Sequence, residues 1–284
     1  MTGLHERASV WRCGAKVFEI DRLHPLIMGI LNVTPDSFSD GGTHNGLEDA
    51  VAWAHRMRDE GAHIIDVGGE STRPGFNETG VTLEEERRRV IPVVERLVKE
   101  GFIVSVDTSK PEIMTEVASL GAHILNDIRG FEMPGALEAA AATDCGLVVM
   151  HRSATTDYKD VVAEVEAYLQ ERQRLLEGLG VSADRICWDP GFGFGKTVEQ
   201  NFALLGSTER FVASGQPYLM GLSRKSSIGA ATGHKAPMDR IAGSIAGALI
   251  AVEQGAQVVR VHDCCQTVDA VAVWRASEEA CGRR

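Results

Sequence analysis

Polar and ionisable side chains recur along this chain directly after short apolar runs. Each run has the length and near-continuous apolar character of a strand buried in a parallel sheet. The side chains at or just beyond the ends of the runs are Asn32, Asp66, Asp107, Asn126, His151, Asp189, Lys225, Arg260 and His262. Together, amides, carboxylates and cations of this kind can hydrogen-bond the edge of a flat heterocycle and neutralise an anion.

Three glycine-rich segments adjoin these positions. Residues 32–42 and 68–75 are rich in turn-forming residues, and the second offers backbone N–H groups, hydroxyls and the guanidinium of Arg73 to a phosphate. The segment 191–196 lacks the spacing of a P-loop and of a dinucleotide-binding loop, so its glycines are better interpreted as shaping a wall of the site. Ordinary turns and helix caps explain each segment equally well when it is considered alone.

The runs that would carry these residues are spaced as in alternating strands and helices. Predicted strands cover residues 27–33, 63–68, 103–108, 123–128, 147–150, 186–189, 218–222 and 258–261. Predicted helices cover residues 47–60, 84–99, 111–120, 161–177 and 239–253. Eight such strands can close into a barrel or open into a doubly wound sheet. A barrel gathers all eight strand ends at one mouth, whereas an open sheet uses only the few beside its switch point. We therefore predict an α/β fold, a (β/α)8 TIM barrel.

The length of 284 residues suits one such barrel, so a single domain is predicted for residues 1–284. Residues 10–25 begin with two short β-like pieces, which predict an N-terminal β-hairpin that plugs the barrel. The net charge of −11 argues against nucleic-acid and anionic-membrane partners. The six cysteines form no CxxC pair, and residues 1–12 lack the apolar stretch of a secretory signal, so a cytoplasmic protein is expected.

The residues that carry this chemistry resemble those of the bacterial dihydropteroate synthases, a family of pterin-binding barrels. The matching segments are residues 28–42, 66–75, 189–196, 223–226 and 260–263, in register from about Leu26 to the last strand. The resemblance implies a transferase of folate biosynthesis. Such an enzyme joins 6-hydroxymethyl-7,8-dihydropterin pyrophosphate to p-aminobenzoate, releases pyrophosphate and forms 7,8-dihydropteroate. It would be a sulfonamide target and, by the same resemblance, a homodimer.

The resemblance also implies a role for each matching residue. Those that would contact the pterin ring are Asp107, Asn126, Met150, Asp189, Phe194, Lys225 and Arg260. Those near the pyrophosphate would be Thr72, Arg73, Arg260 and His262, and those around the aminobenzoate Phe38, Pro74, Lys225 and Ser226. Asn32 would be the protein ligand of a Mg²⁺ cofactor that keeps most of its waters. The catalytic residues would be Asn32, Asp107, Lys225 and Arg260, in a reaction in which pyrophosphate leaves before the amine attacks.

Two departures from the family pattern keep other functions open. After the fifth predicted strand the family usually has Met-His-Met-Gln-Gly and a longer loop, whereas residues 150–154 of this chain are Met-His-Arg-Ser-Ala and the loop is short. The segment 76–80 also makes the second loop slightly longer. A non-catalytic pterin-binding paralogue therefore remains an alternative, which a turnover assay would distinguish. A methyltetrahydrofolate methyltransferase is a second one, but it needs no pyrophosphate site and leaves Arg73, Lys225 and His262 without a purpose.

Overall fold

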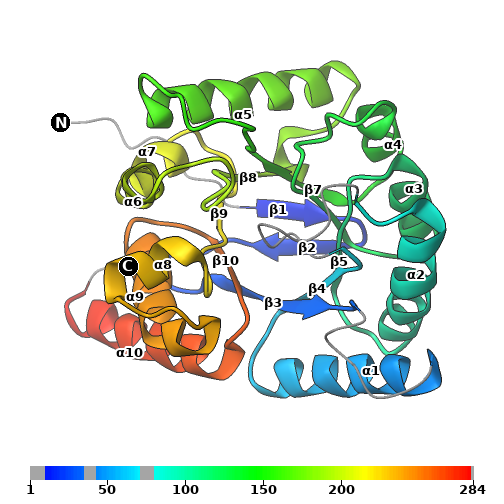
Figure 1. Cartoon of the computed structure of the whole chain (residues 1–284), viewed down its shortest axis with the longest axis horizontal. Coiled ribbons are helices and arrows are strands. Elements are labelled where there is room, and N and C mark those ends of the chain that lie inside the picture. The colour runs from blue at the N-terminus through cyan, green and yellow to red at the C-terminus, as the bar shows by residue number, and fades with distance from the viewer. Residues whose placement is uncertain (1–9, 35–42, 71–79, 283–284) are drawn as a thin grey trace.

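The computed structural model of the chain describes residues 10–34, 43–70 and 80–282. Eight parallel strands form one sheet in the order β8-β7-β6-β5-β4-β3-β10-β9. They are β3 (Leu26–Asn32), β4 (Ile64–Gly68), β5 (Val104–Asp107), β6 (Ile124–Asp127), β7 (Gly146–Met150), β8 (Ile186–Asp189), β9 (Leu219–Met220) and β10 (Val258–Val261). A parallel bridge between Trp188 and Tyr218 joins the two edge strands. The sheet is therefore curled into a near-closed barrel, and the predicted fold class is confirmed (Figure 1).

The seventh strand is shorter than predicted from residues 218–222. Only Leu219 and Met220 pair in the ladder, because the chain then turns toward the mouth of the barrel. Lys225 N donates to Leu222 O at 3.2 Å, which closes this turn, and Arg224 adopts a left-handed conformation with φ of 58°. The turn therefore takes Arg224 and Lys225 out of the strand and places them beside the site.

Helices surround the barrel on the outside. They are α1 (Thr43–Asp59), α2 (Leu83–Lys99), α3 (Pro111–Ser119), α4 (Ala136–Ala141), α5 (Val161–Gly178), α6 (Val198–Gly206), α7 (Thr208–Val212), α8 (Ser226–Thr232), α9 (Ile241–Glu253) and α10 (Cys264–Ala280). Two short 3-10 helices are η1 (Ala183–Arg185) and η2 (Pro237–Arg240). The helices α1, α2, α3, α5 and α9 were predicted from the sequence, whereas α4, α6, α7, α8 and α10 were not. Within the described residues, no helix is long and apolar enough to span a membrane.

Local sequence explains where these helices begin. Thr82 caps α2 by accepting a hydrogen bond from Glu85 N at 3.3 Å, and acidic residues in the first turn favour the positive end of the helix dipole. Asp160 caps α5 in the same way. At α6, Thr197 and Gln200 form a reciprocal capping box. In α2, the buried residues Val90, Val93, Val94 and Leu97 recur on one face, which packs on the barrel.

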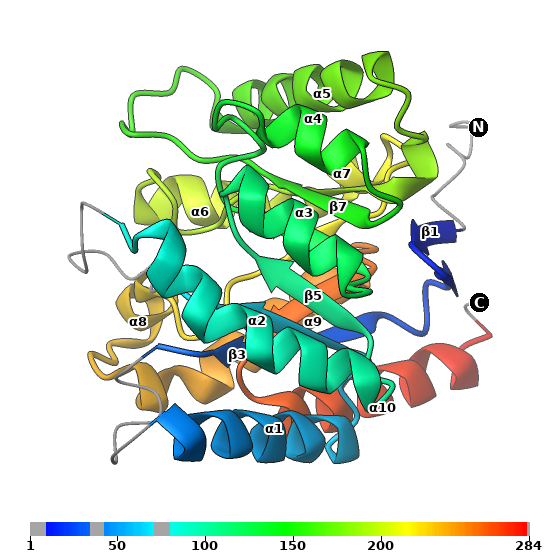
Figure 2. The ribbon, with the colours of Figure 1, turned by 90° about the vertical axis from the view of Figure 1, so that its right-hand side faces the viewer.

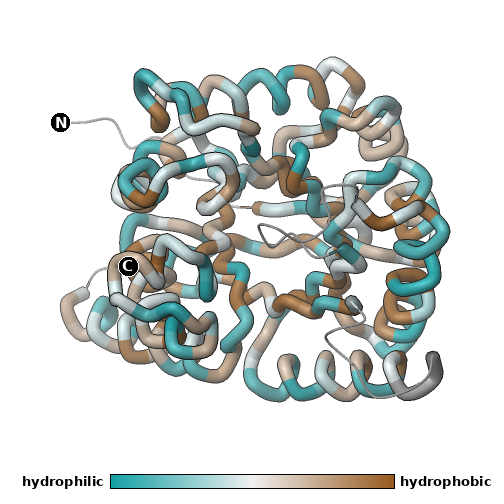
Figure 3. The backbone as a smooth tube through the Cα atoms, in the orientation of Figure 1, coloured by the Kyte–Doolittle hydropathy of each residue, from teal (hydrophilic) through white to brown (hydrophobic). Residues whose placement is uncertain are grey.

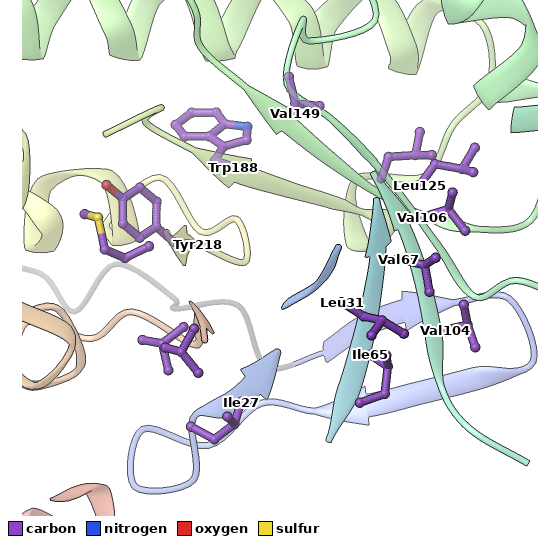
Figure 4. Close-up of a cluster of buried hydrophobic side chains, with 14 of the residues drawn as sticks. Ile27, Leu31, Ile65, Val67, Val104, Val106, Leu125, Val149, Trp188 and Tyr218 are labelled. Atoms are coloured by element: carbon purple, nitrogen blue, oxygen red, sulfur yellow. The ribbon is translucent and has the colours of Figure 1, made fainter. Parts of the chain in front are cut away.

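The main core lies between the strands and the helices. Figure 4 shows part of it, with labelled side chains from β3 to β8, among them Leu31, Val67 and Val106, and with Tyr218 just before β9. Along the backbone, apolar segments gather around the central strands and alternate with polar ones on the outer helices (Figure 3). This alternation is what an amphipathic helix needs to cover a buried sheet, and it holds each strand end in a fixed place.

A second, smaller core fills the N-terminal end of the barrel. The hairpin of β1 (Val10–Cys13) and β2 (Lys16–Glu19) contributes Trp11, Cys13 and Phe18 to it. These side chains pack against inward-facing residues of the strands, which are Leu26, Met28, Ile64, Ile124, Val148, Cys187, Leu219 and Val258. The hairpin crosses the centre of the ring of strands in Figure 1 and lies at the opposite end from α8 in Figure 2. The predicted plug is confirmed.

Candidate functional site

A cavity of about 500 Å³ opens at the C-terminal end of the strands. Ten residues predicted for the site line it: Asn32, Asp107, Asn126, Met150, Asp189, Phe194, Lys225, Ser226, Arg260 and His262. They come from β3, β5, β6, β7, β8 and β10, from the turns that follow β8, β9 and β10, and from the start of α8. The barrel topology thus brings together residues that are up to 230 positions apart in the sequence (262 minus 32). The other predicted residues, Phe38, Thr72, Arg73 and Pro74, lie outside the described residues.

One guanidinium serves two carboxylates on the floor of the cavity. Arg260 Nε donates to Asp66 Oδ2 at 2.6 Å, and Arg260 Nη2 donates to Asp107 Oδ2 at 3.0 Å. Asn126 Nδ2 also donates to Asp66 Oδ2, at 3.2 Å. The second oxygen of Asp66, Oδ1, is buried and has no hydrogen-bond partner among the described residues. Asp66 therefore orients both Arg260 and Asn126 from below.

This cluster holds two carboxyl groups and one guanidinium, so it has an excess negative charge when both carboxyl groups are ionised. Burial raises the pKa of Asp107 to about 8, and the negative charge of Asp66 adds to this effect against the opposing charge of Arg260. Burial alone would lower the pKa of Arg260, but the two carboxylates outweigh it and raise that pKa above its usual value. The arrangement favours a further positive charge near Asp107, because such a charge would balance the second carboxylate.

Asp189 and Lys225 line the cavity beside the glycine-rich loop after β8. Asp189 Oδ1 accepts a hydrogen bond from Gly191 N at 2.7 Å, and burial raises the pKa of Asp189. Lys225 Nζ donates to Phe192 O at 2.5 Å and lies 4.5 Å from the ring centroid of Phe194. Burial lowers the pKa of Lys225 to about 8, with the charge of Asp189 opposing it. The ring of Phe194 supplies an apolar wall, as the glycine pattern predicted.

Further cations surround the outer part of the cavity. Arg224 forms a two-pronged ion pair with Asp263, with Nε 3.0 Å from Oδ2. Within the part of the chain that the structure describes, Arg240 instead donates to backbone carbonyls, among them Arg224 O at 2.9 Å. His262 Nδ1 lies 3.0 Å from the hydroxyl oxygen of the buried Ser223. Among the described residues that line the cavity, Lys225 and Arg240 have no ion pair with a carboxylate, so this region attracts an anion.

The donor set suits a hard cation that keeps most of its waters. Asn32 Oδ1 and Asp107 Oδ2 both lie 3.8 Å from the point where Gly68 would carry a Cβ atom, so two oxygens converge beside a glycine that leaves space. No cluster of three or more His, Cys, Asp or Glu side chains among the described residues has the geometry of a metal site. A single amide oxygen fits Mg²⁺ whose other ligands are water and substrate oxygens.

Several residues of the site were not predicted. Asp66 was noted as a strand end but given no role, because nothing in the sequence shows that it faces Arg260. Arg224 stands in the predicted cationic segment 223–226, whereas Met238 and Arg240 come from η2, whose sequence carries no chemical pattern. Only the fold brings η2 over the cavity. The altered segment after Met150 places His151 away from the cavity, against Tyr158 and Tyr168.

Comparisons with known proteins agree with this geometry. The family described as "Pterin binding enzyme" matches residues 28–262. The dihydropteroate synthase of Escherichia coli K12 is 50% identical over 269 residues, which cover 92% of this chain and 94% of the relative. A solved structure of Xanthomonas albilineans dihydropteroate synthase with 4-aminobenzoic acid has a TM-score of 0.90 and 48% identity, and covers 95% of this chain and 98% of that one.

A second structure from Xanthomonas albilineans holds 7,8-dihydropteroate. It has a TM-score of 0.86 and 43% identity, and covers 95% of this chain and 99% of the other. The similarity therefore extends over nearly the whole length of each protein and includes the strands, the turns and the cavity. On this evidence, the chain belongs to the family of pterin binding enzymes that contains the bacterial dihydropteroate synthases.

Proposed function

We propose that this chain is a dihydropteroate synthase, a transferase that condenses 6-hydroxymethyl-7,8-dihydropterin pyrophosphate with p-aminobenzoate. The observation that carries the proposal is the cavity itself, which joins a hydrogen-bonding, partly apolar inner part to a cationic outer part. The inner part suits a flat heterocycle, and the outer part suits an anion. The relatives named dihydropteroate synthase cover nearly the whole chain, which supports the same reaction.

The pterin ring would bind in the inner part of the cavity. Its edge carries several hydrogen-bond donors and acceptors, and Asp107, Asn126 and Asp189 offer carboxylate and amide groups at adjacent strand ends. Lys225 adds a donor. The faces of the ring would contact Met150 and Phe194 on one part of the wall and the planar guanidinium of Arg260 on another.

The reaction then follows from the charges around Asp107. The C–O bond to pyrophosphate breaks first, which leaves a positive charge on the pterin methylene. This positive charge favours the ionised form of Asp107, which loses any proton it holds to solvent. The cluster of Asp66, Asp107 and Arg260 then has an excess negative charge that stabilises the cation. The amine nitrogen of p-aminobenzoate then forms the C–N bond and loses a proton to solvent. Bound Mg²⁺, with Asn32 as its protein ligand, would neutralise charge on the leaving pyrophosphate.

The second substrate would bind above the pterin. Lys225 and Ser226 line the cavity, and the loop residues Phe38 and Pro74 are proposed to complete the pocket on the basis of the family resemblance. We expect ordered binding, with the pterin first. Calorimetry of p-aminobenzoate at constant Mg²⁺, with and without pyrophosphate, measures this order. Affinity that does not change with pyrophosphate would mean that the aminobenzoate pocket is preformed.

One assay separates this function from the alternative of a non-catalytic pterin-binding paralogue. Purified protein is incubated with the dihydropterin pyrophosphate and Mg²⁺, and pyrophosphate release is measured with and without p-aminobenzoate. A synthase releases pyrophosphate in step with the appearance of dihydropteroate. Pterin binding without any release would support the paralogue, and release of pyrophosphate without dihydropteroate would point to a different acceptor.

We also infer a homodimer, in line with the family resemblance. Apolar side chains stay exposed on the last two helices, with Ile250 of α9 44% exposed and Val273 of α10 74% exposed. Sedimentation velocity at several protein concentrations tests this inference, since a monomer at all concentrations would refute it. Localisation in the cytoplasm remains a prediction, which cell fractionation tests.

A further inference from the structure

The loops after β7 and β8 lie directly against each other beneath the wall of the cavity. A Cβ atom at Gly191 would lie 1.8 Å from His151 O, and one at Gly195 would lie 2.0 Å from Ser153 O. Both glycines have positive φ, 69° and 66°. The two backbones are therefore in direct contact, and the carbonyl groups of His151, Gly191 and Phe194 face a shared space between the loops.

Lys196 points its ammonium group into this space. Its Nζ donates to Gly191 O at 2.9 Å and to Phe194 O at 3.0 Å, both in the loop after β8. It also lies 3.0 Å from His151 Nδ1 and 3.4 Å from His151 O, both in the loop after β7. No ion pair between Lys196 and a carboxylate is present among the described residues. Neutral acceptors therefore satisfy this amino group, and burial lowers its pKa to about 7.

The state of His151 fits this arrangement. Burial lowers the pKa of His151 to about 3, and the positive charge of Lys196 adds to the effect. The imidazole is therefore neutral at physiological pH, and its Nδ1 can accept a hydrogen bond from the ammonium. The ring is fixed on its other sides by an edge contact with Tyr168, at 4.8 Å between centroids, and by Tyr158.

The loop that Lys196 holds is the one that shapes the inner cavity. Asp189, at its start, and Phe194, near its end, both line the cavity, whereas Lys196 does not. From the cavity side, Lys225 donates to Phe192 O. From beneath, Asn201 Oδ1 accepts from Gly193 N at 2.6 Å. Lys196 contributes the bonds to the carbonyls at both ends of this turn, Gly191 and Phe194.

We propose that Lys196 is a positioning residue, whose ammonium ties the loop after β8 to the loop after β7 and so holds Asp189 and Phe194 in the geometry that receives the flat ring. The inference rests on the proposed function, because that function supplies the pterin. It also gives a role to His151 in the loop after β7. His151 supplies two acceptors to Lys196, its Nδ1 and its carbonyl oxygen. The close approach of the two loop backbones requires glycine at positions 191 and 195.

The test compares Lys196→Met, which keeps the length of the side chain but removes its donors, with Lys196→Arg, which keeps charge and donors. Lys159→Met is the matched control, because Lys159 is exposed in the same loop region. The measurements are the Kd for 6-hydroxymethylpterin, which lacks pyrophosphate, and the KM and kcat of turnover. Circular dichroism and thermal melting report on the fold.

We expect Lys196→Met to raise the pterin Kd and KM by about tenfold or more while kcat at saturation changes by less than about threefold. Lys196→Arg should recover part of the affinity, and Lys159→Met should bind like the wild type. Unchanged pterin affinity in folded Lys196→Met, or a loss confined to kcat, would overturn the proposal. If Lys196→Met does not fold, Lys196→Gln takes its place with the same criteria.

Failure of the proposed function gives a different result. In that case the wild-type protein shows no turnover, but the pterin Kd of the variants still reports on the loop. A wild type that turns over and a Lys196→Met variant that binds the pterin normally would reject the positioning role alone.

Discussion

Asp107 shares the guanidinium of Arg260 with Asp66, and this sharing determines its chemistry. A carboxylate in a one-to-one pair would have little negative potential left for a ligand. Here the second carboxylate leaves an excess, at a buried position where charges interact strongly. The site can therefore stabilise a cation that forms only during the reaction.

The first prediction concerns turnover. Asp107→Asn keeps the shape of the side chain and a hydrogen-bond acceptor but removes its charge. We expect kcat to fall by about two to three orders of magnitude, while the Kd for 6-hydroxymethylpterin rises by less than about tenfold, because the charge matters most when the methylene becomes positive. Steady-state kinetics and fluorescence titration measure the two quantities. Equal losses in both would contradict a cationic intermediate.

The same substitution makes a prediction about stability. In the unfolded chain Asp107 loses its proton near pH 4, whereas in the folded protein burial raises its pKa to about 8. Between these values the folded state binds more protons, so this group reduces stability as pH rises. Asp107→Asn should therefore raise the free energy of unfolding at pH 8 by roughly 1 to 3 kcal/mol, with a smaller gain at pH 5.

A carboxylate in a different environment provides the control. Asp263 lies in a one-to-one, two-pronged pair with Arg224. Asp263→Asn removes the partner of a half-buried cation, so it should lower stability at pH 8. Chemical denaturation at both pH values measures these changes. Loss of stability in Asp107→Asn at pH 8 would show that the carboxylate is balanced by Arg260 alone.

Residue identities at the strand ends could be predicted from the sequence, but their pairing could not. Asp107, Asn126 and Asp189 stand out because a polar group ends an apolar run. The contact of Arg260 with Asp66 joins β10 to β4, 194 positions away, and no local pattern encodes it. Arg240 and Met238 reach the cavity only because η2 packs over it. Local sequence patterns thus identify the polar residues at the strand ends, whereas the contacts between these residues depend on closure of the barrel.

At the scale of elements, the crossing of two loops sets a strong constraint. Gly191→Ala would place a methyl group against His151 O, and the position also requires a positive φ of 69°. We expect a loss of roughly 2 to 4 kcal/mol in the free energy of unfolding. Gly180→Ala is the matched control, since Gly180 has φ of 88° but open space around it, and should cost about 1 kcal/mol.

Urea denaturation of the two glycine variants measures the difference. Backbone strain is common to both, so only the steric contact separates them. Equal losses would mean that the two loops can move apart without cost, which would also weaken the positioning role of Lys196.

Three of the five helices that were not predicted share one cause, which is their length. The helices α4, α7 and α8 have six, five and seven residues, too short for a helical period to appear in the sequence. In contrast, α6 carries a capping box at Thr197 and Gln200 that the sequence does display. The longer α10 has its apolar residues spread around its circumference, so no clear amphipathic pattern marks it.

At the scale of the whole molecule, the fourth prediction concerns metal removal. EDTA should abolish turnover, because neither Lys225 nor Arg240 alone neutralises a leaving pyrophosphate. Binding of 6-hydroxymethylpterin should stay within about twofold, since that ligand has no phosphate and its pocket needs no metal. Added Mg²⁺ should restore activity. Turnover that persists in EDTA would exclude Asn32 as a required metal ligand.

The β1–β2 hairpin at the N-terminal end of the barrel affects how ligands enter and leave the site. Trp11 and Cys13 are fully buried in the small core beneath the strands, so the barrel is a cup and not a tunnel. Everything that enters through the mouth must leave by it. A pterin on the floor of the cavity cannot dissociate while an aminobenzoate is bound above it. An aminobenzoate analogue bound near the mouth would block release of the pterin in the same way. Such an inhibitor would trap a substrate that it never touches.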